Sequence, residues 1–287
     1  MNKPFIIAEI GCNHMGRMDL ARKFIRIAKD YCQADAVKFQ TRDIPTWAEK
    51  YPAMYNAPHP NPRNAYGPTY RAHREALEFD LEQNRELKAY CEEQGIIYST
   101  SVWDLPSAQR IASLQPRFIK IPSACNTNLE MLSWLCDNYS GEIQISTGMT
   151  THDEIQTMID LFVKKGRNKD LILYSCTSGY PVPYEDVCLL EIRTLEEKYG
   201  DVVKEIGFSG HHLGTAVDIA AYTLGATYIE RHFTLNKNWK GTDHAASLEP
   251  EEMKRLVTDL NAVHAALQYK KQEVLDIEEV QRKKLKW

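Results

Sequence analysis

The sequence has little of the features that mark membrane-spanning, secreted and nucleic-acid-binding proteins. No run of 18 apolar residues occurs, and residues 1–5 hold no apolar stretch like that of a signal peptide. The 35 Lys and Arg residues are slightly outnumbered by 39 Asp and Glu, so the formal charge of -4 provides no general surface for polyanions. We therefore expect a cytoplasmic protein that binds neither membranes nor nucleic acids.

Cysteine is present but not in the patterns that build disulfide frameworks or structural zinc sites. The seven cysteines are odd in number, and no two are spaced as Cys-x-x-Cys. Disulfide frameworks use even numbers of cysteines, and structural zinc sites use closely spaced pairs. We interpret most of these cysteines as small buried residues.

What the sequence does contain is a short β-rich run followed by an amphipathic helical stretch, repeated eight times. The expected strands are 5–10, 36–40, 96–101, 118–121, 143–147, 171–176, 205–209 and 228–232. The clearest helical stretches are 20–31, 81–93, 152–164 and 216–224. Alternating strands and helices require right-handed parallel crossovers, so eight units predict an α/β fold, a (β/α)8 TIM barrel formed as one domain by residues 1–287.

Two segments depart from this regular alternation. Residues 41–80, between the second strand and its helix, are rich in proline and aromatic residues. A connection of this length is typical of a lid or a binding loop. Residues 270–287 are expected to form a charged, partly amphipathic helix with a basic end, which is either a solvated face or a dimer contact.

Polar side chains stand at the carboxyl ends of the predicted strands, where barrels of this type place their active sites. Lys38 and Lys120, together with several hydroxyls, predict a cationic mouth that binds a phosphate and a carboxylate. The other polar residues at these ends are Glu9, Gln40, Thr100, Ser123, Ser146, Ser178, Tyr180, Ser209 and Glu230.

Two histidines end the seventh and eighth predicted strands. As neutral imidazoles, His211 and His232 could reach one divalent metal ion. Two histidines completed by oxygen or water ligands suit Mn²⁺ best, with Co²⁺, Mg²⁺ or Zn²⁺ as alternatives. Asp243, in the turn that follows, could contact the metal or a substrate hydroxyl, or could be an ordinary turn residue.

The ordered motifs resemble the signatures of the sialic acid synthases over residues 5–265. They are Ile6-Ile7-Ala8-Glu9-Ile10-Gly11, Val37-Lys38-Phe39-Gln40-Thr41, Ser99-Thr100, Lys120-Ile121-Pro122-Ser123, Ser146-Thr147-Gly148-Met149, Tyr180-Pro181-Val182-Pro183 and Ile229-Glu230-Arg231-His232-Phe233-Thr234. Any one of these tetrapeptides would be a weak signal, but agreement in order along the chain is a strong one.

The resemblance implies condensation of phosphoenolpyruvate with an aldose, giving a 3-deoxy-2-ulosonic acid and phosphate. It implies that phosphoenolpyruvate is bound by Lys38, Gln40, Thr100, Lys120, Ser123, Ser146 and Ser209. It implies that the metal is held by His211 and His232, and that the sugar is oriented by Glu9, Tyr180 and Asp243. The catalytic residues would be Glu9, Lys38, Lys120, His211 and His232, and the protein is expected to be a homodimer.

Departures from the family pattern concern the sugar. Ala124-Cys125 stands where relatives commonly have Gly-Glu, Gly210 where they have Asp, and Ser178 where many have Asn. We also expect residues 1–287 to lack the antifreeze-like domain whose arginine approaches the sugar in the family. We therefore expect residues 66–74 to cover the acceptor, with Arg71 and Arg74 on one helix face, although a plain helix start with a solvated basic face is the alternative.

Two other functions remain open from the sequence. Lys38 or Lys120 could form a Schiff base with a keto acid, as in an aldolase or lyase, although the histidine pair disfavours this. A barrel that binds a sugar acid without chemistry is suggested by the altered positions Ala124, Cys125 and Gly210. The identity, chain length and phosphorylation of the acceptor sugar are not readable from these residues.

Overall fold

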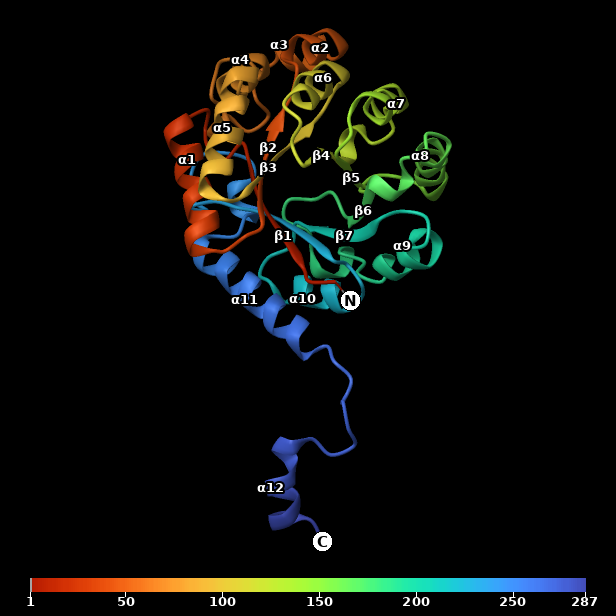
Figure 1. Cartoon of the computed structure of the whole chain (residues 1–287). Coiled ribbons are helices and arrows are strands. Elements are labelled where there is room, and N and C mark those ends of the chain that lie inside the picture. Colours follow the sequence, from red (N-terminus) through yellow and green to blue (C-terminus); the bar gives the residue numbers. More distant parts are fainter. Residues whose placement is uncertain (1) are drawn as a thin grey trace.

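The computed structural model describes residues 2–287, so Met1, the first residue of the predicted domain, lies outside the described residues. Eight parallel strands close into a barrel in sequence order, with β1 paired to β8 (Figure 1). They are β1 Phe5–Gly11, β2 Ala36–Thr41, β3 Ile97–Val102, β4 Phe118–Ile121, β5 Glu142–Ser146, β6 Leu171–Cys176, β7 Glu205–Gly210 and β8 Tyr228–His232. The predicted (β/α)8 barrel is confirmed.

Helices cover the outside of the barrel. They are α1 Met18–Arg26, α5 Leu81–Gln94, α6 Leu105–Ser113, α7 Leu129–Asn138, α8 His152–Lys164, α9 Glu191–Tyr199, α10 Ala216–Thr223 and α11 Pro250–Ala266. Local sequence explains where several begin and end. For example, α5 begins with a capping box between Asp80 and Gln83, and it ends at Gly95, whose positive φ of 69° suits glycine.

The interior of the barrel has two layers of inward-facing side chains. Its lower layer is an apolar cluster formed by Ile7, Ala36, Phe118, Ile172, Tyr174 and Tyr228. Because side chains on a strand alternate, residues two positions further along also face inward. On β1, β2, β4 and β8 these residues are Glu9, Lys38, Lys120 and Glu230, all buried, and they form the upper layer, nearer the carboxyl ends of the strands. Along these four strands, the inward-facing side chains therefore change from apolar to charged over two residues.

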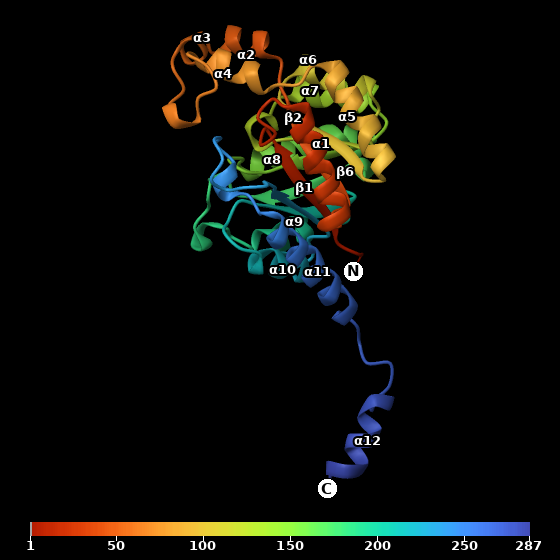
Figure 2. The same cartoon turned by 90° about the vertical axis from the view of Figure 1, so that its left-hand side faces the viewer.

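The connection between β2 and α5 is mostly folded into helices. It contains α2 Ile44–Lys50, α3 Pro52–Asn56 and α4 Tyr70–Leu77. These three helices lie together at the end of the molecule opposite the C-terminus (Figures 1 and 2). The connection also touches the loop after β8, because the Tyr66 hydroxyl donates to the Lys240 carbonyl at 2.5 Å. The expectation of a long loop is thus corrected to a helical insertion anchored at its tip.

The C-terminal segment carries the predicted charged helix, α12 Asp276–Leu285, which holds no buried residue. Both cartoon views show it standing clear of the barrel beyond α11 (Figures 1 and 2). Among residues 2–287, no helix is both long enough and apolar enough to cross a membrane. The cytoplasmic location stays a prediction.

Candidate active site

A cavity of about 300 Å³ opens at the carboxyl ends of the strands. Its polar lining residues are Glu9, Lys38, Gln40, Ser101, Lys120, Ser123, Ser146, Cys176, Ser178, Tyr180, Ser209, His211, Glu230 and His232. Its apolar lining residues are Trp103, Pro122, Ala124 and Met149. Every strand contributes at its end or in the loop that follows. The structure therefore brings together most of the polar residues that the sequence predicted at this face.

Two lysines and two glutamates form a closed charge cluster at the cavity floor. Lys38 Nζ lies 2.5 Å from Glu9 Oε2 and 3.6 Å from Glu230 Oε1, and Lys120 Nζ lies 2.9 Å from Glu230 Oε2. The floor is charge-balanced, so the prediction of a simply cationic mouth was wrong. The sequence analysis placed Glu230 among the polar strand ends but assigned it no role, although its place two residues before His232 on one strand puts both side chains on the same face.

Burial and ion pairing shift the pKa values of this cluster in different directions. Burial raises the pKa of Glu9, although Lys38 opposes the shift. Burial lowers the pKa of Lys120 despite its partner Glu230. For Lys38 burial also acts downward, but Glu230 and Glu9 together outweigh it and raise the pKa. Lys120 Nζ also lies 3.5 Å from the centroid of the Tyr174 ring, and its lowered pKa is what a Schiff-base lysine requires, so the pKa alone does not exclude the aldolase alternative.

Hydroxyl groups surround the charge cluster. The Ser101 hydroxyl accepts a hydrogen bond from Lys38 Nζ at 2.7 Å, and the Ser209 hydroxyl donates to Glu230 at 3.1 Å. A Cβ at Gly148 would lie 2.4 Å from Ser178 Oγ and 2.8 Å from Ser123 Oγ. Glycine at this position therefore lets two cavity hydroxyls approach each other, which suits an anion with several oxygens.

Thr100, predicted to contact phosphoenolpyruvate, is not part of the cavity wall. Its hydroxyl lies 3.0 Å from the Thr41 hydroxyl and is buried among the outward-facing side chains of β3. The register pairs Gln40 with Ser101, so Ser101 shares the inward face of Lys38 and Gln40. The prediction is corrected by one residue, and strand alternation counted from Lys38 could have found it.

The two histidines lie side by side, with ring centroids 5.4 Å apart. His211 Nδ1 is 3.1 Å from the Thr177 carbonyl, which favours a proton on Nδ1 and leaves Nε2 free to bind a metal. Burial lowers the pKa of His211 to about 3, so its imidazole is neutral, as a metal ligand must be. His232 Nδ1 is buried without a hydrogen-bond partner among the described residues.

The donor set fits a metal with open coordination positions. Residues 2–287 contain no group of three or more His, Cys, Asp or Glu side chains placed to hold an ion together. The protein would therefore supply two imidazole ligands, and water or substrate oxygens would complete the coordination. Such a site suits an exchangeable catalytic ion and not a closed structural one.

Two side chains predicted for the sugar, Glu9 and Asp243, converge around Gly11 with Gln40, which was predicted for phosphoenolpyruvate. A Cβ at this position, where φ is 54°, would lie 2.9 Å from Gln40 Nε2, 3.2 Å from Glu9 Oε1 and 3.6 Å from Asp243 Oδ2. Glu9 and Gln40 line the cavity, whereas Asp243 stands behind them. Tyr180 also lines the cavity, with its ring centroid 4.5 Å from that of His211.

A model of the NeuB family matches residues 24–272. This chain belongs to the NeuB family. It is 38% identical over 263 residues to N-acetylneuraminate-9-phosphate synthase of Homo sapiens, which covers 92% of this chain and 71% of that protein. It is 36% identical over 272 residues to N,N'-diacetyllegionaminic acid synthase of Campylobacter jejuni, covering 93% of this chain and 78% of that one.

A solved structure supports the same relationship. The N-acetylneuraminic acid synthetase of Leptospira borgpetersenii, solved in complex with citrate, superposes with a TM-score of 0.81 at 29% identity. The alignment covers 99% of this chain and 93% of that chain. The resemblance inferred from the ordered motifs is confirmed, and the relatives show this NeuB-family chain to be a synthase-type protein.

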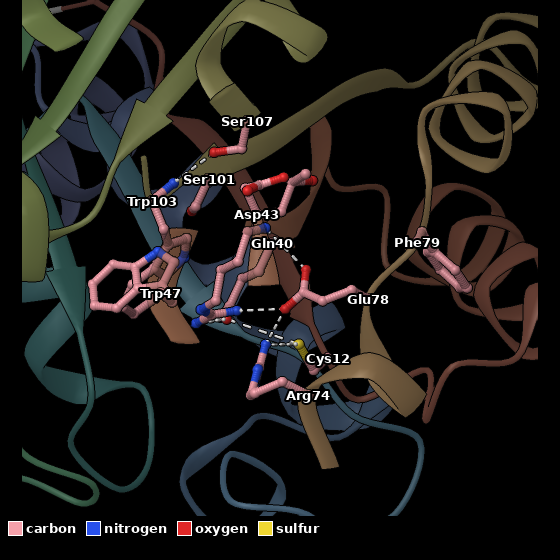
Figure 3. A network of polar contacts seen from close by, with 12 residues as sticks. Cys12, Gln40, Asp43, Trp47, Arg74, Glu78, Phe79, Ser101, Trp103 and Ser107 are labelled. Atoms are coloured by element: carbon pink, nitrogen blue, oxygen red, sulfur yellow. Dashed lines mark hydrogen bonds and ion pairs between the residues drawn. The ribbon is translucent and has the colours of Figure 1, made fainter. Parts of the chain in front are cut away.

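Arg71 and Arg74, predicted to meet the sugar, lie outside the cavity wall of this NeuB-family protein. Arg74 is buried, pairs with Glu78 and donates to Cys12 Sγ at 3.4 Å (Figure 3). Arg71 is exposed and pairs with Glu75 at 2.7 Å. The two arginines therefore differ in burial, and neither lines the cavity. Each has a glutamate one helical turn away, which holds it against α4.

The departures from the family pattern fall into two groups. Ala124 and Ser178 line the cavity, so they bear on what it binds. Gly210 does not, because a Cβ there would point outward and meet the His212 and Phe208 rings at 2.8 Å. Cys125 is also directed away, with Sγ 3.6 Å from the Val102 carbonyl. The expectation that all these positions affect sugar recognition is thus corrected.

Proposed function

We propose that the protein is a transferase that condenses phosphoenolpyruvate with an aldose, giving a 3-deoxy-2-ulosonic acid of the sialic acid type and phosphate. The observation that carries the proposal is a cavity in which two lysines, five serines and a histidine pair converge from the ends of seven strands. The names of the relatives support the same reaction class. The acceptor is proposed to be an N-acylmannosamine-like hexose or its phosphate.

Phosphoenolpyruvate would bind at the cavity floor. Its phosphate and carboxylate would face Lys38 and Lys120, with Ser101, Ser123, Ser146, Ser209 and Gln40 as further donors. Both lysines already face carboxylates, so a bound anion competes with Glu9 and Glu230 for them. Because burial raises the pKa of Glu9, this carboxyl is the group best suited to take up a proton when the anion arrives.

The open-chain sugar would bind above the floor, toward β1, β6 and β8. His211 and His232 would hold a divalent ion, with Mn²⁺ proposed, and the ion supplies Lewis-acid chemistry at the sugar aldehyde. Glu9 and Tyr180 would position the sugar hydroxyls, with Ser178 as a further contact and Asp243 behind Glu9. The cavity walls would exclude bulk water from the reacting atoms.

In the proposed reaction, a bond forms between C3 of phosphoenolpyruvate and the aldehyde carbon. The aldehyde oxygen takes a proton and becomes a hydroxyl. Water then adds at C2, and the bond between C2 and the bridging oxygen breaks, so that phosphate leaves with that oxygen. Glu9, close to Lys38 at the cavity floor, is proposed to exchange the protons.

The test is a phosphate-release screen with phosphoenolpyruvate, Mn²⁺ and a panel of free and phosphorylated aldoses that includes N-acylmannosamines. We expect one phosphate per ulosonic acid and loss of turnover with chelator. His211→Ala should abolish turnover, whereas Arg71→Ala, outside the cavity, should retain it. Borohydride trapping of a pyruvate adduct without phosphate release would indicate the Schiff-base aldolase. Absence of turnover across the panel, with Mn²⁺ still bound, would indicate a non-catalytic sugar-binding barrel.

We further propose that the protein is a homodimer that uses α12. Ile277 and Val280 on this helix are 83% and 69% exposed, and a ten-residue helix is marginal in water without a packing partner. Its acidic first turn and basic last turn would complement each other in an antiparallel pair. Replacing both apolar residues by Asp should lower the sedimentation coefficient to that of a monomer, and an unchanged coefficient would contradict the pairing.

A further inference from the structure

Arg231 lies on β8 between two cavity residues, but its side chain faces the opposite way. Glu230 and His232 point into the cavity, and Arg231 is buried between the barrel and α10 with 1% of its surface exposed. Its guanidinium donates to the His212 carbonyl at 2.6 Å and to the Gly214 carbonyl at 2.8 Å. Arg231 therefore joins the strand that carries His232 to the segment directly after His211.

A buried acid and an imidazole complete this arrangement. Arg231 also pairs with Asp218 in the first turn of α10, and the His212 ring lies 3.3 Å from the same carboxylate and 3.0 Å from the guanidinium. The ring packs over Gly210, where a Cβ would meet it at 2.8 Å. Glycine at position 210 thus has a structural reason, which is room for His212.

The position of His211 depends on this arrangement because the strand pairing ends just before it. The β7–β8 register stops at Gly210 opposite Arg231, whereas His232 is still paired with Glu9 of β1. His211 is tied to the segment after β6, through its carbonyl to Val182 N at 3.0 Å and through its ring to Thr177. The arginine supplies the connection from the His211 segment to β8.

We propose that Arg231, held by Asp218 and His212, is a positioning residue that sets the spacing of His211 and His232 and thereby the affinity for a divalent ion. The inference rests on the proposed metal role of the two histidines. Groups behind a metal ligand act by fixing its orientation, and their loss typically weakens metal binding by about 10- to 100-fold. A residue with a purely structural role would lower stability without changing metal affinity.

The experiment measures Mn²⁺ affinity of the full chain by calorimetry, without substrates, alongside thermal unfolding. Arg231→Lys keeps the charge but loses the forked contacts to two carbonyls, so its dissociation constant should rise about 10- to 100-fold. Asp218→Asn and His212→Gln are smaller changes that should weaken binding in the same direction. These two variants answer the question even where Arg231→Lys does not fold.

The matched control is Arg167→Lys. Arg167 is another arginine that clamps backbone carbonyls, those of Cys136 at 3.0 Å and Gly141 at 2.9 Å, but it touches neither histidine segment. Its variant should lose stability and bind Mn²⁺ within twofold of wild type. If the Asp218 and His212 variants also bind within twofold of wild type, the positioning role is wrong. If wild type itself binds no Mn²⁺, the proposed metal site fails and the inference falls with it.

Discussion

The lower and upper layers of the barrel interior lie on the same strands, two residues apart, and have opposite chemistry. On β4, Phe118 belongs to the lower layer and Lys120 to the upper one, and on β1 the corresponding pair is Ile7 and Glu9. All are buried. Both layers therefore lie on the same strands and are equally buried, so the difference between them comes from the chemistry of the side chains.

The two layers differ in what they contribute to stability. A buried phenylalanine or isoleucine stabilises the fold by roughly 1.5–3 kcal/mol relative to an exposed one. A buried ion pair gains little, because taking both charges out of water costs about as much as their attraction returns. The lower layer thus contributes more to the stability of the barrel than the charged upper layer does.

The largest effect should come from removing one upper-layer charge. Lys120→Met should weaken binding of phosphoenolpyruvate by about 2–5 kcal/mol, because it truncates one partner of a buried charge contact. The free energy of unfolding should change less, since Lys38 remains 3.6 Å from Glu230. Calorimetric titration and urea unfolding measure the two quantities. The control is Lys88→Met, which removes a surface ion pair with Glu92. An unchanged affinity for phosphoenolpyruvate in Lys120→Met would contradict the assignment of ligand binding to the upper layer.

The opposite profile is expected two residues earlier on the same strand. Phe118→Ala should lower the free energy of unfolding by about 3–5 kcal/mol, because the side chain is fully buried and packs edge-on against Phe5. Affinity for phosphoenolpyruvate should remain within a few-fold of wild type at a temperature where the variant is folded. A variant that lost affinity while keeping its stability would show that the layers are not separate.

The layers also explain which parts of the structure could be predicted from sequence. Strand type and position follow from hydrophobic runs, so β4, β6 and β8 were predicted with the observed bounds. Convergence of Lys38, Lys120 and the two histidines follows from barrel geometry. The ion pairs follow only in part. Glu9 and Lys38 are cross-strand neighbours on β1 and β2, whereas Glu230 on β8 reaches Lys120 on β4 across the barrel, and sequence distance carries no signal for that contact.

The remaining errors have local physical causes. Thr100 was predicted in place of Ser101 because a motif was read without counting the alternation of the strand. Arg71 and Arg74 were expected to reach the sugar, but Arg71 pairs with Glu75 at the surface and Arg74 is buried against Glu78, so neither lines the cavity. The proline-rich connection was expected to be a loop, although proline is well tolerated in the first turn of the short helices observed there.

The smallest expected effect concerns the pH dependence of the unfolding free energy, which should change on substitution of His14 at the upper end of the barrel but not on substitution of Ile7 in the lower layer. His14 follows β1 at the upper end, stacks on Phe79 at 4.0 Å and is fully buried, and burial lowers its pKa to about 3. In the unfolded chain its pKa is about 6.5, so between these values the unfolded state binds one more proton, and the free energy of unfolding falls as pH decreases. His211 contributes in the same direction. Removing His14 alone should therefore make the decline of the unfolding free energy shallower by about 1 kcal/mol per pH unit near pH 5.5.

The test is urea unfolding of His14→Gln at pH 7, 6 and 5, and the matched control is Ile7→Val in the lower layer. That control should lose about 0.5–1.5 kcal/mol at every pH and keep the wild-type slope, because the residue it changes carries no proton. Parallel slopes in all three proteins would show that His14 does not contribute to the acid sensitivity of the upper end.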